Sequence, residues 1–392
     1  MLLIIPDFFT VFFLFFALFY IAAIFVLLKG LLSLKLQKTQ HGRCFSVVIA
    51  ARNEEDTIGK CLESVLGQTL EKDRYEIIVV NDRSTDSTAE IVKGFISRYG
   101  NVSLVNIEKT AQGVSPKKYA VGRGINASGN EVIVFTDADC IVPSTWLETI
   151  DRYFSEDTGF VQGITTYMQP EGMNSFFYGI QAVDFLSHGI ISAAGIGMGM
   201  PINSNANNLA FSKKAFTELG GYENMGGKVV SGDDDLLLQK IWKSKKWGIR
   251  YFCDPGGAVF TRPTETVKGV FEQRKRWGSK TVHYTARQVV FLSGIFLFYM
   301  SVLASLMLGF FDSRYFIIFL IMFFVKLAGE FLLMWPGSGL FNRLDLRKYI
   351  IPGSIVQLPL VVSAVLSGVL GKFKWKDQTF TRTINADGNE IN

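Results

Sequence analysis

Four short apolar runs, each followed by polar residues, constrain the fold of this chain more than any other feature. They cover residues 45–51, 76–80, 102–106 and 132–135, and the segments between them carry apolar residues at helical spacing. Strands that alternate with helices in this way form a parallel sheet with right-handed crossover connections. The sequence therefore predicts an α/β domain with a mostly parallel, Rossmann-like sheet.

Acidic side chains follow three of these runs. Glu54 comes after the first run, Asp82 after the second, and Asp137 and Asp139 after the fourth. Ligands of open α/β sheets bind in the crevice at the carboxyl ends of the strands, so these carboxylates are expected to converge. Two carboxylates one residue apart can hold a divalent cation, which usually also takes oxygens from a substrate's phosphates. An isolated Asp-x-Asp is more often a solvated turn, so the convergence is what favours a site for Mn²⁺ or Mg²⁺.

The sequence has no glycine-rich phosphate loop of the Gly-x-x-x-x-Gly-Lys-Ser/Thr type. A nucleotide would instead be held by carboxylates, since Asp82 and Glu54 could accept hydrogen bonds from a base or from ribose hydroxyls. The metal would neutralise a diphosphate. Lys117 and Lys118, at the start of a predicted helix, could add positive charge there, although a solvated helix face explains the pair equally well.

The N-terminal apolar stretch, residues 8–28, is uncharged and long enough to cross a bilayer. It lacks the features of a cleaved signal peptide, so we expect an uncleaved anchor. Lys29, Lys35, Lys38 and Arg43 follow it, and the positive-inside rule then puts the α/β domain in the cytoplasm.

Three more apolar stretches lie near the C-terminus, at residues 289–310, 315–335 and 349–370. If all three crossed, the basic tail would lie outside, against the positive-inside rule. Pro352 and Pro359 are expected to break the last stretch, which we interpret as re-entrant or interfacial. In the middle stretch Lys326 and Glu330 could pair or face the protein interior.

Residues 176–199 form another apolar segment, but it contains Asp184 and His188. A charge at the bilayer centre costs about 2.5–3.5 kcal/mol on insertion scales, so we favour an amphipathic helix at the membrane face or the acceptor groove over a second spanning helix. His188 is expected to be an ordinary polar neighbour there.

Composition supports a membrane protein rather than one that binds nucleic acid. The net charge is only +5, and Lys and Arg gather beside the apolar segments. The four cysteines are scattered, so we expect no disulfide frame and no zinc site. The predicted divisions are an anchor and basic linker (1–42), a cytosolic α/β domain (43–287), transmembrane or interfacial helices (288–371) and a polar tail (372–392).

Two further patterns lie downstream. Three adjacent acids, Asp233 to Asp235, are expected at a helix N-terminus, where negative charge is favourable. In the run of residues 273–277, Gln273, Arg276 and Trp277 can share one helix face. Arg suits a diphosphate and Trp suits a sugar ring, although a juxtamembrane belt of basic and aromatic residues is the alternative.

Residues 46–55, 79–88 and 136–139 resemble the corresponding motifs of the family 2 glycosyltransferases, which have a GT-A fold, and the resemblance continues to about residue 277. It implies that Ala51, Arg52, Glu54 and Asp82 bind the nucleotide of a nucleotide-sugar. It also implies that Asp137 binds ribose and metal and that Asp139 is the closer metal ligand.

The resemblance further implies that Asp234 is the general base and Asp233 its neighbour, although a shift to Asp235 stays open. Gln273, Arg276 and Trp277 then match the family's Gln-x-x-Arg-Trp motif, on the acceptor and diphosphate side. The implied reaction is an inverting single displacement, so no covalent nucleophile is expected.

We therefore predict a metal-dependent glycosyltransferase in a bacterial cell membrane, which takes a uridine-linked sugar from the cytosol. A lipid acceptor is favoured over a growing polysaccharide, because an export channel needs more crossings than this chain offers unless it forms an oligomer or has a partner. A catalytically inactive scaffold is the weaker alternative, since Asp82, Asp137, Asp139 and Asp234 are all present.

Overall fold

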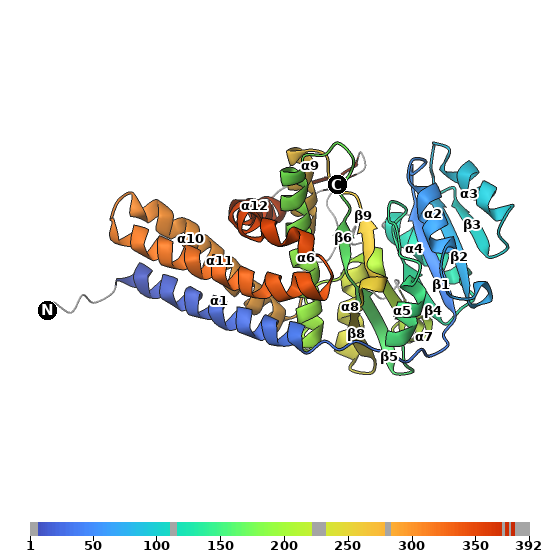
Figure 1. The fold of residues 1–392 in the computed structure, drawn as a ribbon, viewed down its shortest axis with the longest axis horizontal. Coiled ribbons are helices and arrows are strands. Elements are labelled where there is room, and N and C mark those ends of the chain that lie inside the picture. Colours follow the sequence, from blue (N-terminus) through green and yellow to red (C-terminus); the bar gives the residue numbers. More distant parts are fainter. Residues whose placement is uncertain are drawn as a thin grey trace.

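A computed structural model describes residues 7–109, 116–221, 233–278, 284–370, 373–375 and 378–380. Figure 1 shows an α/β domain at one end and the long helices α1 (Phe8–Leu32), α10 (Ala286–Gly309) and α11 (Arg314–Leu340) at the other, with α6 (Ser175–Gly197) between the two parts. The N-terminal helix α1 belongs to the long helices although the chain continues directly into the sheet.

The central sheet has the strand order β3-β2-β1-β4-β7-β5-β8. β1 pairs in parallel with β2 and β4, β2 pairs in parallel with β3, and β5 pairs in parallel with β8, whereas β7 is antiparallel to both neighbours. The predicted mostly parallel sheet is confirmed. The strands are β1 Phe45–Ala51, β2 Tyr75–Asp82, β3 Val102–Ile107, β4 Val132–Phe135, β5 Thr158–Gly163, β7 Leu209–Ser212 and β8 Gly248–Phe252.

Helices cover both faces of this sheet, which is why its strands read as continuous apolar runs. In β1, Val47 and Ile49 pack with α2, α3 and α5, whereas Val48 packs on the opposite face with α4, α7 and α8. These helices are α2 Ile58–Leu66, α3 Thr88–Ile96, α4 Pro116–Ala127, α5 Trp146–Tyr153, α7 Lys213–Glu218 and α8 Asp233–Ser244, with short helices η1 Lys72–Arg74, η2 Ala206–Asn208 and η4 Pro255–Gly257.

A second small sheet extends the α/β domain toward the long helices. It pairs β6 (Thr165–Tyr167) with β9 (Val259–Thr261) in parallel. Residues 158–167 are thus divided between two sheets, because the chain leaves the central sheet after Gly163. A further hairpin near the C-terminus joins β10 (Phe373–Trp375) to β11 (Gln378–Phe380).

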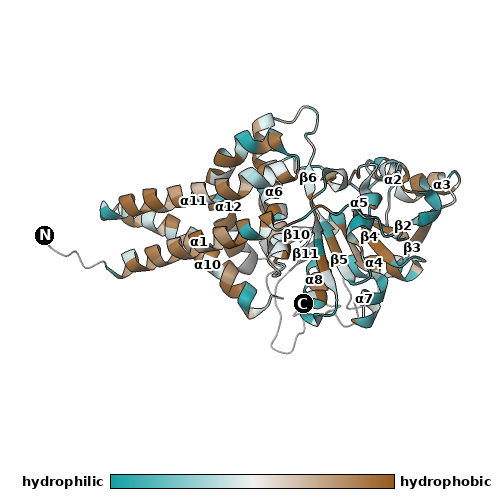
Figure 2. Cartoon of the chain, turned by 60° about the horizontal axis from the view of Figure 1, so that its bottom comes forward, coloured by the Kyte–Doolittle hydropathy of each residue, from teal (hydrophilic) through white to brown (hydrophobic). Residues whose placement is uncertain are grey.

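Four helices are long and apolar enough to cross a membrane in the part of the chain that the structure describes. In Figure 2 most of their ribbon is brown, the colour of hydrophobic residues. They are α1 Phe8–Leu32, α10 Ala286–Gly309, α11 Arg314–Leu340, and the segment Leu344–Ser367, which comprises η6 (Leu344–Tyr349) and most of α12 (Ile350–Leu370). In α11, Lys326 forms an ion pair with Glu330 at 2.7 Å, and the Lys326 side chain is fully buried, as the sequence suggested.

α12 differs from the sequence prediction, because it continues through both prolines instead of breaking. Pro352 lies in the first turn, where the missing N–H would have no partner within the helix. Pro359 lies in the interior and removes only one helical hydrogen bond. Figure 1 shows α12 nearly end-on beside α6 and α9 (Val267–Gly278), across the direction of α1, α10 and α11.

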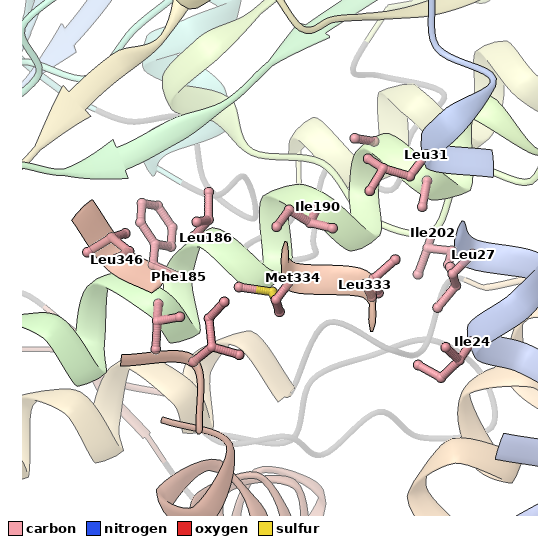
Figure 3. Close-up of a cluster of buried hydrophobic side chains, with 14 of the residues drawn as sticks. Ile24, Leu27, Leu31, Phe185, Leu186, Ile190, Ile202, Leu333, Met334 and Leu346 are labelled. Atoms are coloured by element: carbon pink, nitrogen blue, oxygen red, sulfur yellow. The ribbon is translucent and has the colours of Figure 1, made fainter. Parts of the chain in front are cut away.

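Helix α6 (Ser175–Gly197) joins the two parts of the molecule. It contacts α1, α11 and α12 on one side and β6 and β8 on the other. Among the described helices it is not one that could span a membrane, which agrees with the sequence analysis, and most of its length is buried. Figure 3 shows Leu27 of α1, Ile190 of α6 and Met334 of α11 in one buried cluster.

Glycines allow α1 and α6 to approach closely. A Cβ on Gly197 would lie 2.1 Å from the carbonyl oxygen of Gly30, and one on Gly30 would lie 2.3 Å from the oxygen of Ala194. Ser33 also donates a hydrogen bond from Oγ to the Gly197 oxygen, at 3.0 Å. The contact between α1 and α6 therefore depends on backbone atoms that meet directly.

We predict that Gly197→Ala destabilises the protein by about 1–3 kcal/mol, because the added methyl group forces α1 and α6 apart. Gly94→Ala is the matched control, since a Cβ there meets nothing within 4 Å and alanine favours the helix by about 1 kcal/mol. Thermal unfolding in lipid nanodiscs measures both. Equal melting temperatures for the two variants would contradict the close-contact interpretation.

Candidate active site

The loops after β1 and β2 are held to each other at the carboxyl edge of the sheet. The Asn53 side chain accepts a hydrogen bond from the Thr85 N–H at 2.8 Å, and the Asn53 N–H donates to Ser84 Oγ at 3.0 Å. Asn53 has a φ of 52°, a left-handed conformation that asparagine tolerates well. This arrangement places Glu54 and Asp82 at neighbouring strand ends, as the sequence predicted.

Asp137 and Asp139 follow β4 in a strongly acidic environment. Lys117 Nζ lies 3.5 Å from Asp137 Oδ1, and Thr261 donates a hydrogen bond to Asp139 Oδ2 at 3.2 Å. Burial, together with the negative charges of Asp137 and Glu54, raises the pKa of Asp139. A cation bound between these groups would relieve this repulsion.

These carboxylates fit a metal that is shared with a substrate. No cluster of three or more His, Cys, Asp or Glu side chains suited to a metal occurs among the described residues. Two carboxylates with substrate phosphates are nevertheless a usual ligand set for a hard divalent cation. Such an ion would offset the repulsion between Asp139 and its acidic neighbours.

A cavity of about 750 Å³ connects these carboxylates to the long helices. Asp137, Asp139 and Asp234 line it. Apolar side chains of α10 and α12 also line it, namely Val289, Leu292, Ile295, Phe296, Val361, Ala364 and Val365. One cavity thus reaches from a polar, acidic region to two helices that could lie in a membrane.

The acidic N-terminus of α8 lies on the cavity wall. Asp234 and Asp235 are both buried and both line the cavity. Asp235 Oδ1 accepts a hydrogen bond from the Ser204 N–H at 2.6 Å, which fixes that side chain in place. The side chain of Asp233 lies outside the described residues. Burial and the charges of Asp235 and Asp234 raise the pKa of the nearby Tyr284.

The α9 residues Gln273 and Trp277 line the same cavity, as their helical spacing predicts. Gln273 Oε1 accepts hydrogen bonds from the hydroxyl of Tyr167 at 3.2 Å and from Arg274 at 2.6 Å. The Trp277 ring stacks on Phe185, with centroids 5.6 Å apart. The side chain of Arg276 lies outside the described residues.

An ion pair between α6 and α9 supports this wall. Asp184 Oδ2 accepts a hydrogen bond from Arg274 Nε at 2.6 Å, and both side chains are buried. Burial alone would raise the pKa of Asp184, but the Arg274 guanidinium outweighs it and lowers the pKa. One turn further along α6, burial lowers the pKa of His188 to about 4, so this imidazole is neutral at pH 7.

Family profiles match both the α/β domain and the helices that follow it. The profile of glycosyl transferase family 2 matches residues 46–179, and that of glycosyl transferase family group 2 matches residues 132–341, more than half of the chain. The chain belongs to glycosyl transferase family group 2. The sequence prediction of a glycosyltransferase is therefore confirmed.

The chain is similar to proteins that have different names and come from different organisms. Glycosyltransferase AglE of Haloferax volcanii is 35% identical over 32% of this chain and 41% of its own length. Beta-monoglucosyldiacylglycerol synthase of Synechocystis is 24% identical over 59% of this chain and 46% of its own. Poly-beta-1,6-N-acetyl-D-glucosamine synthase of Staphylococcus epidermidis is 26% identical over 62% and 56%. The chain thus spans about half or less of the length of these relatives.

A solved structure supports the predicted GT-A-type fold of this glycosyltransferase. The mannosyltransferase PcManGT of Pyrobaculum calidifontis, in complex with GDP-Man and Mn²⁺, is 15% identical and has a TM-score of 0.55. The alignment covers 90% of this chain and 98% of that one. At this identity the likeness establishes the fold alone.

Only some of the predicted site residues of this glycosyltransferase line the cavity. Lys117, Asp137, Asp139, Asp234, Gln273 and Trp277 line it, whereas Ala51, Arg52, Glu54, Asp82 and Lys118 do not. Lys118 is buried within α4. The first four lie at or just beyond the ends of β1 and β2, beside the acidic end of the cavity.

Sequence reasoning missed several cavity residues. Arg274 was overlooked because the helix-face argument selected its neighbours, although its proximity in sequence to Gln273 was visible. Arg262 follows β9 next to Thr261, and Tyr284 precedes α10; no motif marks either residue, and only the fold brings them to the cavity.

The neutral, half-buried His188 predicts a loss of stability in acid. The unfolded chain takes up a proton near pH 6.5, but the folded protein takes it up only near pH 4, so the free energy of unfolding falls as the pH decreases through this window. The expected loss is up to about 3 kcal/mol. Thermal unfolding at pH 7.5 and pH 5 measures it, and His188→Gln should reduce the difference. His41→Gln, at an exposed site, should leave it unchanged.

Proposed function

We propose that this glycosyltransferase transfers a sugar from a nucleoside diphosphate sugar to a lipid acceptor held in the membrane. The observation that carries the proposal is the single cavity, which joins Asp137, Asp139 and Asp234 to apolar side chains of α10 and α12. A water-soluble acceptor would not require an apolar passage between two helices that could span a membrane. A lipid, by contrast, can enter along that passage and present its head group to the carboxylates.

The proposed reaction is an inverting single displacement. An acceptor hydroxyl attacks the anomeric carbon, the bond from that carbon to the diphosphate oxygen breaks, and the nucleoside diphosphate leaves with the electron pair. Asp234 takes the hydroxyl proton. We assign this role to Asp234, the second acid of the triplet, because the alignment with the family motif places the base there. Buried carboxylates in a cavity of this kind suit general-base work.

The donor end of the site is proposed at the ends of β1, β2 and β4. Glu54 and Asp82 would bind the base and ribose, and Asp137 and Asp139 would hold Mn²⁺ or Mg²⁺, which neutralises the diphosphate when bound. Lys117, beside Asp137, would add positive charge. We propose a uridine-linked sugar as donor.

We further propose that the catalytic domain lies in the cytoplasm. The basic residues Lys29, Lys35 and Lys38 at the end of α1 support this orientation, since cytoplasmic flanks of membrane helices are enriched in Lys and Arg. Polysaccharide synthesis is the alternative function, because the Staphylococcus epidermidis relative is named as a polysaccharide synthase. Because the apolar walls of the cavity suit acyl or prenyl chains better than a glycan, we favour the lipid.

We predict that Asp234→Asn lowers turnover by about 10²- to 10⁴-fold while nucleotide-sugar binding persists, since only the proton acceptor is lost. Asp139→Asn should instead weaken metal-dependent donor binding. Transfer from radiolabelled UDP- and GDP-sugars to lipid extract, in nanodiscs with Mn²⁺, measures both. Asp73→Asn, at an exposed site, is the control. If Asp235→Asn abolished transfer while Asp234→Asn retained it, the base would be misassigned.

A second prediction concerns the apolar end of the cavity. Val365→Trp fills the passage and should raise the KM for the lipid acceptor at least tenfold, with no change in the KM for the donor. Leu366→Trp is the matched control, because Leu366 is exposed and does not line the cavity. Val289→Trp and its neighbour Val290→Trp repeat the test on α10. Equal effects within each pair would contradict a lipid in this passage.

A further inference from the structure

A second cavity, of about 240 Å³, lies at the C-terminal ends of α6 and α8. Its wall is mostly apolar and aromatic, and Lys245 adds a charged side chain to it. The indole rings of Trp242 and Trp247 both line this space, so we call it the tryptophan pocket. Its apolar lining is completed by Ile196, Pro201 and Ile249.

The tryptophan pocket adjoins the end of the N-terminal helix α1. Ser33, the residue that follows α1, donates a hydrogen bond to the Gly197 carbonyl oxygen at 3.0 Å. Trp242 Nε1 donates to the Gly199 carbonyl oxygen, also at 3.0 Å. Only Met198 separates these two acceptors in the sequence. Because α1 could span a membrane, the pocket lies at the level where that helix would leave the bilayer.

A second candidate membrane helix, α10, begins beside the same pocket. The Pro201 carbonyl oxygen accepts hydrogen bonds from Gln288 Nε2 at 2.6 Å and from Gln239 Nε2 at 3.2 Å. Gln288 lies in the first turn of α10. The ends of α1 and α10 that face the catalytic domain therefore both reach the tryptophan pocket, which places it at the level of lipid head groups.

Lysines surround the entrance of the tryptophan pocket. Lys243, Lys245 and Lys246 lie at the turn between α8 and β8, and all three are exposed. From α7, Lys214 Nζ lies 5.8 Å from the centre of the Trp247 ring. This part of the surface therefore combines two indole rings with several ammonium groups.

Two acidic residues on the neighbouring turn do not cancel this charge. Glu156 and Asp157 are exposed, and the Asp157 carbonyl oxygen accepts a hydrogen bond from the Gly248 N–H at 2.7 Å. The Asp157 carboxylate is paired with Arg250 at 3.1 Å. Glu156 thus remains opposite the lysine cluster, and the surface around the pocket stays positive.

This combination suits a ligand that is both anionic and partly apolar. Trp is enriched where proteins meet the membrane–water interface, and lysines near the surface are attracted to anionic lipids. The Lys245 ammonium group can pair with a lipid phosphate, while the indole rings and Ile196 contact the glycerol backbone and the first methylene groups. A soluble phosphate ion would leave the apolar walls without a partner.

We propose that the tryptophan pocket binds the head group of an anionic phospholipid from the leaflet that faces the catalytic domain. The inference goes beyond the proposed function, because it depends on neither the donor nor the acceptor. A lipid held there contacts α8, whose first turn carries Asp234, and the loop at Pro201 that continues into the wall of the large cavity at Ile202. It would thus hold the catalytic domain against the membrane surface.

The test titrates the full-length protein in detergent micelles with phosphatidylglycerol and, separately, with phosphatidylcholine, and measures bound lipid by native mass spectrometry. We expect phosphatidylglycerol to bind about tenfold more tightly or better. The double variant Lys245→Gln, Lys246→Gln should weaken its binding about ten- to thirtyfold, because each lysine contributes to the attraction. The matched control is Lys60→Gln with Lys93→Gln, which removes the same charge from exposed sites on α2 and α3. Lys245→Arg keeps the charge and should retain binding.

Three results would overturn the inference. Equal affinity for the two lipids would show that the lysines do not select an anionic head group. Equal losses in the two double variants would attribute the binding to general surface charge. Displacement of phosphatidylglycerol by the same concentration of sn-glycerol 3-phosphate would assign the pocket to a soluble phosphate. None of these results bears on sugar transfer, so the proposed function is tested separately.

Discussion

The buried ion pair between Asp184 of α6 and Arg274 of α9 joins two helices that both pack against α12. Removing one partner of such a pair leaves an uncompensated buried charge, so the two helices that carry it, α6 and α9, are held in a fixed relation. Arg274 also bonds Gln273 and stacks on Trp277, and Gln357 of α12 approaches Asp184 at 3.4 Å. The cavity wall, the catalytic domain and α12 therefore share one electrostatic anchor.

The carboxylates Asp137, Asp139 and Glu54 form a cluster of like charge at the edge of the sheet. Burial, together with the negative charges of Asp137 and Glu54, raises the pKa of Asp139. A divalent cation bound at these carboxylates would relieve this repulsion. Hydrogen bonds around Asn53 hold the loops after β1 and β2 to each other beside the cluster.

The sequence was sufficient to predict the sheet and its acidic edge, because both follow from local patterns. Apolar runs of strand length end at Asp82 and before Asp137, and parallel pairing alone brings their ends together. The cavity could not be predicted, because its walls come from distant segments such as β5, α6 and α12. The unbroken α12 was also missed, since proline spacing does not reveal that Pro352 falls in a first turn. In the sequence, the charge of Asp184 argues against a spanning helix. That Arg274 is its partner follows only from the fold.

The mixed lining of the cavity has a consequence for the proposed direction of substrate binding. The carboxylates Asp137, Asp139 and Asp234 share the wall with apolar side chains of α10 and α12. In the proposed reaction an amphipathic acceptor would therefore bind with its chain against the apolar side chains and its hydroxyl toward Asp234. The donor would bind at the ends of β1, β2 and β4, where the other acidic side chains lie. A difference in polarity between the two parts of the wall would then direct each substrate to its own position.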